Sequence, residues 1–305
     1  MNAPDWIAPL FPDGARDRMI ETRGERMAVL EWGVPKGPNG KTVVFVHGNP
    51  TWAFLWRRVI AELRASDPEL HLVAPDLVGL GRSSKPAASA HTLVNHGEWL
   101  GELIDAVAPG PIVLVAQDWG GAIGLSALAH GRRDRLRGIV FGNTAVGPPA
   151  QGFKPTLFHR MARWPIASSL LFERLGFPLG VMHMTQGDRS SIRGDVARAY
   201  RWPLAHRRDR AAPLALARMV PDSHDRHPSI PELQLTDALF REAKVPVSLV
   251  WGMKDPILGR VVNHLARIRP DATVTKTGAG HFLQEEVPGE LAAAVRDVVA
   301  RADWS

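Results

Sequence analysis

The chain of 305 residues contains no cysteine and only one tyrosine. Without cysteine it can form neither a disulfide framework nor a thiolate metal site. No segment approaches the roughly 20 consecutive apolar residues that a membrane-spanning helix needs. Residues 1–19 also lack the basic start and apolar stretch of a secretory signal. From these absences we expect a cytoplasmic protein with no bound metal and no membrane partner.

Dense basic sequence is missing as well, although the formal net charge is +6. Residues 151–230 carry 13 Lys and Arg against 6 Asp and Glu, whereas the rest of the chain carries 24 against 25. The basic residues of this segment are mostly arginines scattered through helical-looking sequence. No module places aromatic residues beside a basic stripe, so we interpret the arginines as solvated helix faces and expect no nucleic-acid partner.

The sequence does contain an alternation of strand-like and helix-like segments. Alternation of this kind is typical of a mainly parallel sheet covered by helices on both faces. The eight expected strands are a hairpin of 18–23 and 27–32 turning at Gly24, followed by 42–46, 70–74, 112–116, 137–142, 247–251 and 272–276. The expected helices between them are 52–63, 92–107, 119–130, 257–268 and 288–301.

The alternation is interrupted in the middle of the chain. From Gly147-Pro148-Pro149 to about Pro231 the sequence is helical and punctuated by prolines, with no convincing strand. We therefore predict a core domain made of residues 1–146 and 232–305. Residues 147–231 are predicted to form an all-helical cap over one edge of the sheet.

Ligands of such sheets bind beyond the carboxyl ends of the strands, so the residues that follow each strand are the first candidates for a site. The strand 112–116 runs through Gln117-Asp118-Trp119-Gly120-Gly121 directly into a helix. This arrangement has the form of a nucleophile elbow, whose usual pattern is Gly-x-Ser-x-Gly. Here Asp118 takes the place of serine and Ala116 that of the first glycine. A lone Asp at this point would more often be a helix cap, but a carboxylate is also suited to displacing a leaving group at saturated carbon.

Two further strand ends supply the partners of such a nucleophile. Asp255 follows the strand 247–251, and His281 follows the glycine-rich turn after the last strand. The chain order Asp118, Asp255, His281 is the nucleophile–acid–base order of the hydrolase fold. The first loop, His47-Gly48-Asn49-Pro50, comes after the strand whose following loop donates an oxyanion-hole amide in that fold. We expect His47 itself to be structural.

Longer motifs in the chain resemble those of the haloalkane dehalogenases, a family with the α/β-hydrolase fold. They are HGNPTW at 47–52, LWR at 55–57, APDLVGLGRS at 74–83, QDWGG at 117–121 and GHFLQEE at 280–286. The resemblance covers about residues 20–145 and 232–300, and the cap matches only in general character. The combination of Asn49 with Asp118 and Trp119 is more specific than the glycine motifs, which mark the fold in general.

The resemblance implies a reaction. Asp118 would attack a small uncharged halogenated alkane and form an alkyl ester, which water activated by His281 would hydrolyse to a primary alcohol, a halide and a proton. The Trp119 indole and the Asn49 side-chain amide would hold the departing halide, and the backbone N–H groups of the same two residues would form the oxyanion hole. Both side chains are neutral donors, so they can stabilise the halide without releasing a proton. No cofactor is implied.

Asn143 separates two subgroups of the family. Some members carry a glutamate at this position to orient the histidine, but a neutral amide cannot stabilise an imidazolium in the same way. Asp255 is therefore the expected acid. The resulting Asp-His-Asp triad with an Asn–Trp halide pair resembles a subgroup whose members tend to form oligomers.

Related activities remain as alternatives. An epoxide hydrolase needs two cap tyrosines, and this chain has only Tyr200. A fluoroacetate dehalogenase needs arginines soon after the nucleophile, where this chain has residues 120–123 (GGAI), and an esterase needs serine at 118. A luciferase of this fold typically has glutamate in place of Asn143. A non-catalytic ligand-binding protein on the same scaffold would not need these residues together.

Aromatic residues of the cap are candidates for lining a substrate pocket. Packing of the cap onto the core is at least as good an explanation for each of them. The candidates are Phe158, Trp164, Phe172 and Trp202, together with Phe282 beside His281.

Overall fold

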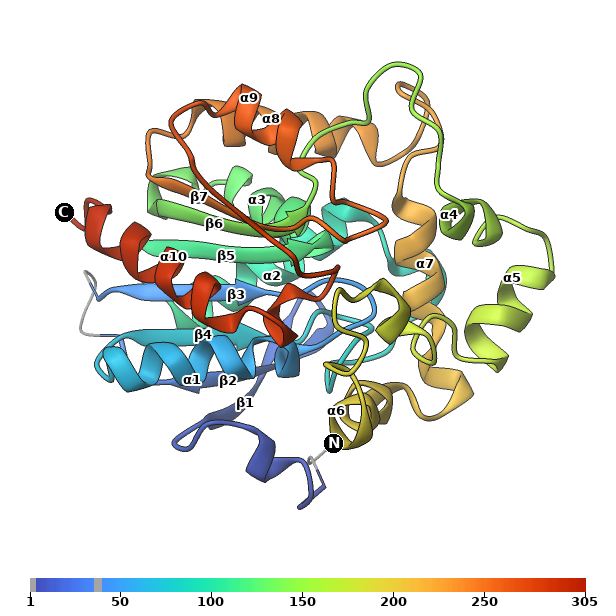
Figure 1. The fold of residues 1–305 in the computed structure, drawn as a ribbon, viewed down its shortest axis with the longest axis horizontal. Coiled ribbons are helices and arrows are strands. Elements are labelled where there is room, and N and C mark those ends of the chain that lie inside the picture. Colours follow the sequence, from blue (N-terminus) through green and yellow to red (C-terminus); the bar gives the residue numbers. More distant parts are fainter. Residues whose placement is uncertain (1–3, 36–39) are drawn as a thin grey trace.

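The computed structural model describes residues 4–35 and 40–305, so the first three residues of the predicted core domain lie outside the description. In this part of the chain an eight-stranded sheet runs in the order β1-β2-β4-β3-β5-β6-β7-β8 (Figure 1). β2 pairs antiparallel with β1 and β4, and all other neighbours are parallel. The prediction of an α/β fold with a mostly parallel eight-stranded sheet is confirmed.

The strands follow the predicted segments closely. They are β1 (Arg16–Thr22), β2 (Glu25–Trp32), β3 (Thr42–Val46), β4 (His71–Pro75), β5 (Ile112–Asp118), β6 (Leu136–Thr144), β7 (Val247–Gly252) and β8 (Thr273–Thr277). The central strands β3 and β5 contain the apolar runs 43–46 (VVFV) and 112–116 (IVLVA), without polar alternation. Such runs are expected where helices cover both faces of a parallel sheet.

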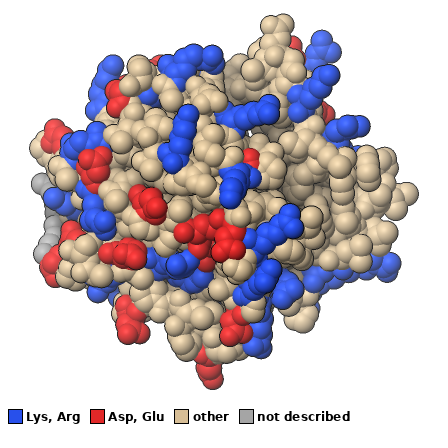
Figure 2. All heavy atoms as spheres, viewed as in Figure 1, with Lys and Arg blue, Asp and Glu red and all other residues tan. Residues whose placement is uncertain are grey.

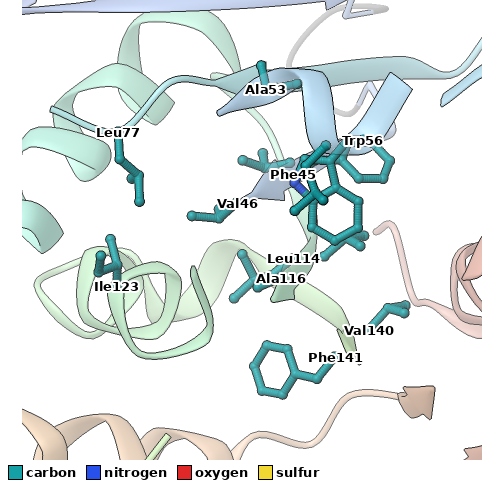
Figure 3. Close-up of a cluster of buried hydrophobic side chains, with 14 of the residues drawn as sticks. Phe45, Val46, Ala53, Trp56, Leu77, Leu114, Ala116, Ile123, Val140 and Phe141 are labelled. Carbon is teal, nitrogen blue, oxygen red and sulfur yellow. The ribbon is translucent and has the colours of Figure 1, made fainter. Parts of the chain in front are cut away.

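Helices pack on both faces of the sheet (Figure 1). α1 (Arg57–Ser66) and α10 (Pro288–Arg301) pack together on one face, and α2 (Leu93–Val107), α3 (Trp119–Ala129) and α8 (Ile230–Glu242) form the other layer. Figure 3 shows the core where β3, β5 and β6 meet these helices. There the Phe45 and Trp56 ring centroids lie 5.4 Å apart, and both side chains are fully buried.

The segment between β6 and α8 contains helices and turns but no strand among its residues, all of which are described. Its helices are α4 (Leu157–Met161), α5 (Ala167–Ser169), α6 (Gly194–Arg201) and α7 (Ala211–Met219), and a π-helical turn, Leu170–Arg174, follows α5. The predicted boundary at 231/232 falls within the first turn of α8, a helix that packs against α3 of the core. The division into core and cap stays a prediction. No helix of the described residues is long and apolar enough to cross a bilayer.

Two predicted helices begin later than expected. α9 (Val262–Ile268) begins at Val262 instead of residue 257 because the preceding residues turn around Asp255. The Ile257 N–H donates to Asp255 Oδ1 at 2.7 Å, and the Gly259 N–H donates to the Asp255 carbonyl at 3.2 Å. The predicted helix 52–63 starts instead as a 3-10 turn, Ala53–Trp56, before α1.

Candidate active site

The site lies where the strand order of the sheet reverses. The chain leaves β3 toward β4 on one side and later enters β5 on the other side, so β3 and β5 are neighbours whose following loops diverge. Ligands of open α/β sheets bind at such a switch point. It brings the loop after β3, with Gly48 and Asn49, against Asp118 at the end of β5. A Cβ on Gly48 would lie 2.3 Å from Asp118 Oδ1, so only glycine permits this approach.

Asp118 occupies a sharp turn between β5 and α3. Its φ of 53° and ψ of −128° form a strained conformation for a residue with a side chain. The turn needs small neighbours, because a Cβ on Gly120 would lie 2.1 Å from the Val46 carbonyl oxygen and one on Gly121 would lie 2.2 Å from Thr144 Oγ1. These are the features of a nucleophile elbow. The Asp118 side chain keeps 18% of its area exposed above the sheet.

Backbone donors hold the Asp118 carboxylate from one side. The Asn49 N–H donates to Oδ1 at 2.8 Å, and the Trp119 N–H is a second backbone donor to the carboxylate. Burial raises the pKa of Asp118 above its ordinary value, although His281 and these two donors oppose the rise. The other oxygen, Oδ2, lies 3.7 Å from His281 Nε2.

The imidazole of His281 lies between two carboxylates. Its Nδ1 is 2.8 Å from Asp255 Oδ2, so Nδ1–H donates to Asp255 while Nε2 faces Asp118. Burial alone would lower the pKa of His281, but the Asp255 and Asp118 carboxylates outweigh it and raise the pKa. Burial acts to raise the pKa of Asp255. The charge of His281 and the hydrogen bonds that Asp255 accepts outweigh burial, so the pKa of Asp255 is lowered. The interaction between His281 and Asp255 therefore stabilises the ionised form of Asp255.

Asn143 supports Asp255 from the end of β6. Its Nδ2 donates to Asp255 Oδ2 at 2.7 Å and to the Gly252 carbonyl at 3.0 Å, while its Oδ1 accepts from the Gly252 N–H at 2.7 Å. The amide that stands at the alternative acid position thus contacts the acid directly. It adds one more hydrogen bond that stabilises the carboxylate form of Asp255.

The side chains of Asn49 and Trp119 flank Asp118. Asn49 Nδ2 donates one hydrogen bond, at 3.0 Å, to the Pro213 carbonyl of α7 and retains a second hydrogen. Trp119 is partly buried, and its indole N–H makes no hydrogen bond with the described part of the chain. Each of the two side chains therefore has an N–H group that can donate a hydrogen bond to a ligand.

Gln117 is a site residue whose role the sequence did not reveal. Its Nε2 donates to the His281 carbonyl at 3.1 Å and lies 3.3 Å from His281 Nε2. The carbonyl contact fixes which end of the amide faces the histidine. The buried Gln117 Oε1 has no partner within the described residues. Gln117 stands inside the elbow motif, but the sequence carries no signal for the direction of its side chain.

A cap segment that the sequence did not single out fastens the loop bearing His281. We call residues 185–188 the clip. The Thr185 carbonyl accepts from the His281 N–H at 2.9 Å. The Gln186 side chain accepts from the Phe282 N–H at 2.9 Å and donates to the Phe282 carbonyl at 3.1 Å. The Glu286 carboxylate accepts from the backbone N–H groups of residues 187 and 188 at 3.0 and 2.7 Å.

The candidate pocket residues lie in different places. Phe282 is buried against His281, with ring centroids 4.6 Å apart. Phe158 and Phe172 pack against each other at 5.6 Å within a cluster inside the cap. Trp202 lies 5.7 Å from the buried Trp52, and Trp164 is 49% exposed. Of the five, the structure brings Phe282 into direct contact with the triad.

The fold and this constellation define an α/β hydrolase with an aspartate at the nucleophile position. Residues 41–288 match the family model described as alpha/beta hydrolase fold, which is more than half of the chain. A haloalkane dehalogenase of Mycobacterium marinum is 33% identical over 265 residues, 85% of each chain. One from Mycolicibacterium paratuberculosis is 31% identical over 292 residues, 94% of this chain and 90% of the relative. The chain belongs to the haloalkane dehalogenase family.

Solved structures give the same result. The crystal structure of haloalkane dehalogenase DbeA from Bradyrhizobium elkani superimposes with a TM-score of 0.82 at 26% identity, covering 94% of this chain and 98% of that one. Haloalkane dehalogenase DatA from Agrobacterium tumefaciens superimposes with a TM-score of 0.82 at 25% identity, covering 96% and 98%.

Proposed function

We propose that this chain is a haloalkane dehalogenase that hydrolyses carbon–halogen bonds in two stages, by way of an alkyl ester on Asp118. The observation that carries the proposal is the position of the Asp118 carboxylate. The Asn49 N–H donates to one oxygen, and the His281 imidazole faces the other across 3.7 Å. Family membership supports the same reaction class.

In the first stage, Oδ2 of Asp118 attacks the carbon that bears the halogen, on the side opposite to the halogen. The new C–O bond forms as the carbon–halogen bond breaks, and the halide leaves with the electron pair. Oδ2 is the attacking oxygen because the Asn49 N–H occupies Oδ1. The free N–H of Trp119 and the second amide hydrogen of Asn49 stabilise the halide. No general acid is needed, since halide leaves without a proton.

In the second stage, His281 Nε2 takes a proton from water as the water oxygen attacks the carboxyl carbon of the ester. Negative charge develops on Oδ1, which already accepts from the Asn49 N–H, and the Trp119 N–H is a second backbone donor to the same carboxyl group. The intermediate then expels the alkoxide, which His281 protonates, and the carboxyl group formed on Asp118 loses its proton. The alcohol therefore carries the former Oδ2, and the oxygen of water enters Asp118.

The surroundings of Asp118 favour an uncharged substrate. The first turn of α3 after Trp119 is Gly-Gly-Ala-Ile, which offers no cation for a carboxylate substrate. We propose small halogenated alkanes as substrates and primary alcohols as products. The contact of Asn143 with Asp255 supports an Asp-His-Asp triad, with Asn49 and Trp119 as the halide pair.

The proposal is tested by trapping the ester. His281→Gln removes the base of the second stage, so incubation with 1-bromobutane should add one butyl group to the protein and release one equivalent of bromide. Intact mass and peptide mapping should place the group on Asp118, and Asp118→Ala should give neither adduct nor bromide. A wild-type single turnover in ¹⁸O-water should label Asp118 and leave the first alcohol unlabelled. Labelled alcohol in that turnover would exclude the ester and indicate direct attack by water.

A further inference from the structure

Large apolar side chains are exposed together at one end of the cap. Leu157, Trp164, Ile166, Leu170 and Leu175 expose 62, 49, 89, 48 and 73% of their surface, and we call these five residues the cap tip. Leu157 lies in α4 and Leu170 in the π-helical turn, and the other three lie in the segments directly beside α4, α5 and this turn, at the right-hand end of the molecule in Figure 1. Exposed apolar clusters of this kind mark surfaces that bind a partner or a membrane.

Helical spacing places arginines among these side chains. Two successive segments each contain two of the exposed apolar residues and one arginine at spacings of three or four residues. These sets are Leu157-Arg160-Trp164 and Ile166-Leu170-Arg174. Trp164 lies beyond the end of α4, and Ile166 lies before the start of α5. The inward faces of the same segments pack Phe158, Ala162 and Phe172 against α7, so the outward faces are not needed for the core of the cap.

Ile166 is exposed and has a strained backbone conformation. Its φ is 61°, in the left-handed region that β-branched residues rarely adopt, and its side chain is the most exposed of the five. Glycine or asparagine would relieve this strain. A large apolar residue at this turn has no packing explanation in the described part of the chain.

The charge of the cap indicates what could cover the tip. Residues 151–230 carry 13 basic against 6 acidic residues, while the rest of the chain is nearly balanced. The side chains of Lys154, Arg160 and Arg174 make no ion pair or hydrogen bond with the described residues. Figure 2 shows a largely uncharged right-hand end with Lys and Arg along its margins, whereas acidic side chains lie mainly on the left-hand part of this face. Two cap tips would repel each other, so an anionic surface is the complementary partner.

We propose that the cap tip docks on the surface of an anionic phospholipid bilayer. The five apolar side chains would enter the boundary between headgroups and acyl chains, while Arg160 and Arg174 would extend to the phosphates. From the sequence we expected no membrane partner, because no apolar segment is long enough to cross a bilayer, and we interpreted the arginines as solvated helix faces. The exposed apolar side chains between them, which only the structure reveals, lead to the opposite inference.

Vesicle flotation tests the proposal without any substrate, so its result is independent of the dehalogenase assignment. The wild-type chain should float with vesicles of phosphatidylcholine mixed with phosphatidylserine and stay unbound with phosphatidylcholine alone. Replacing Ile166, Leu170 and Leu175 together by Ser should weaken binding at least about tenfold, because most of the buried apolar surface is lost. Arg160→Glu with Arg174→Glu should weaken it by about 25-fold or more, since each basic residue near the surface contributes about fivefold.

A matched control separates docking through the tip from attraction by net charge. Arg260→Glu with Lys276→Glu makes the same change in net charge on exposed residues of the core. This variant should float like the wild type. Equal losses for the two charge-reversed variants would overturn the proposal, as would failure of the wild type to bind anionic vesicles. Circular dichroism and thermal unfolding of each variant show whether a loss reflects unfolding.

A local reporter gives a second readout. The chain has no native cysteine, so Ile166→Cys accepts a single environment-sensitive dye at the tip, and Ala293→Cys places the same dye on the exposed face of α10. Anionic vesicles should shift the emission of the first label to the blue and leave the second unchanged. A blue shift that instead grows with protein concentration in the absence of vesicles would show that a second copy of the chain covers the tip, and would refute bilayer docking.

Discussion

The core and the cap hold the proposed site by different means. The core contributes the reacting groups, each placed by backbone at the end of a strand: Asn49 after β3, Asp118 on β5, Asp255 after β7 and His281 after β8. The cap contacts two of these loops, through the clip at His281 and Phe282 and through the Pro213 carbonyl that accepts from Asn49. Phe158 and its neighbours pack within the cap itself. The strand ends of the sheet therefore position the reacting groups, and the short helices and turns of the cap hold one of the loops in place. Substitutions in the two regions test this difference.

The largest effect is expected for substitution of Asp255. In the proposed mechanism its carboxylate orients the imidazole of His281, the base, and raises its pKa. Asp255→Asn should slow hydrolysis of the ester by about a thousandfold or more, as in related triads. The ester should then accumulate, so a burst of halide should precede a slow steady state in stopped-flow measurements. A parallel loss in the burst itself would show that Asp255 acts on alkylation and not on the base.

The same variant changes the pH profile in a defined direction. His281 must be neutral to accept a proton, so activity is lost as pH falls through its pKa. In the free enzyme Asp255 and Asp118 raise that pKa. Asp118 loses its charge when it becomes the ester, so Asp255 is the carboxylate that keeps the pKa raised during ester hydrolysis, and the acid limb of the wild type should lie at higher pH than it would without that carboxylate. His159 of the cap does not contribute a charge there, since burial lowers its pKa to about 4. Asp255→Asn should move the acid limb to lower pH.

The next effect compares two glycines. Gly120→Ala places a Cβ 2.1 Å from the Val46 carbonyl, which is backbone of β3 and cannot move aside. Unfolding free energy should fall by about 2 kcal/mol or more. Gly180→Ala in the cap meets no atom within 4 Å and should leave stability within about 0.5 kcal/mol of the wild type. Denaturant unfolding measures the stability of both variants. Equal losses of unfolding free energy would contradict the interpretation that the core is closely packed at Gly120 and the cap has space at Gly180.

The smallest effect is expected in the clip. Gln186→Ala removes both hydrogen bonds to the Phe282 backbone and should slow ester hydrolysis by about tenfold, the equivalent of about 1.4 kcal/mol. Alkylation, which does not need His281, should keep its rate. Gln151→Ala, on an exposed cap residue, is the control and should change neither stage. If Gln186→Ala slows both stages alike, the clip acts on the whole cap and not on the base.

Much of the core could be predicted because its signals are local. The apolar run 42–46 is β3 without any change of bounds, and the elbow around Asp118 combines a strand, an acidic residue and two glycines within a few positions. Asn49 and His281 follow from strand ends in the same way. The starts of helices were less accurate: residues 257–261 wrap Asp255, a contact that periodicity cannot indicate.

The cap contacts could not be predicted in this way. α4 and α5 have five and three residues, too short to show a helical period, and a π-helical turn follows them. Gln186 bonds a residue 96 positions away and stands in no motif. Gln117 does stand in the elbow motif, but its amide contacts His281, 164 positions away, and the motif does not encode this tertiary contact. Which cap aromatics pack internally, as Phe172 does, also depends on helix placement that the pattern does not encode.

The clip has a consequence for the way in which substrates enter. A cap that swung open like a hinged cover would release the Thr185 and Gln186 bonds and free the loop that carries the imidazole. Each admission of a substrate would then cost the enzyme its base. Entry of a substrate without release of these bonds avoids this conflict, so the Thr185 and Gln186 contacts should persist throughout turnover.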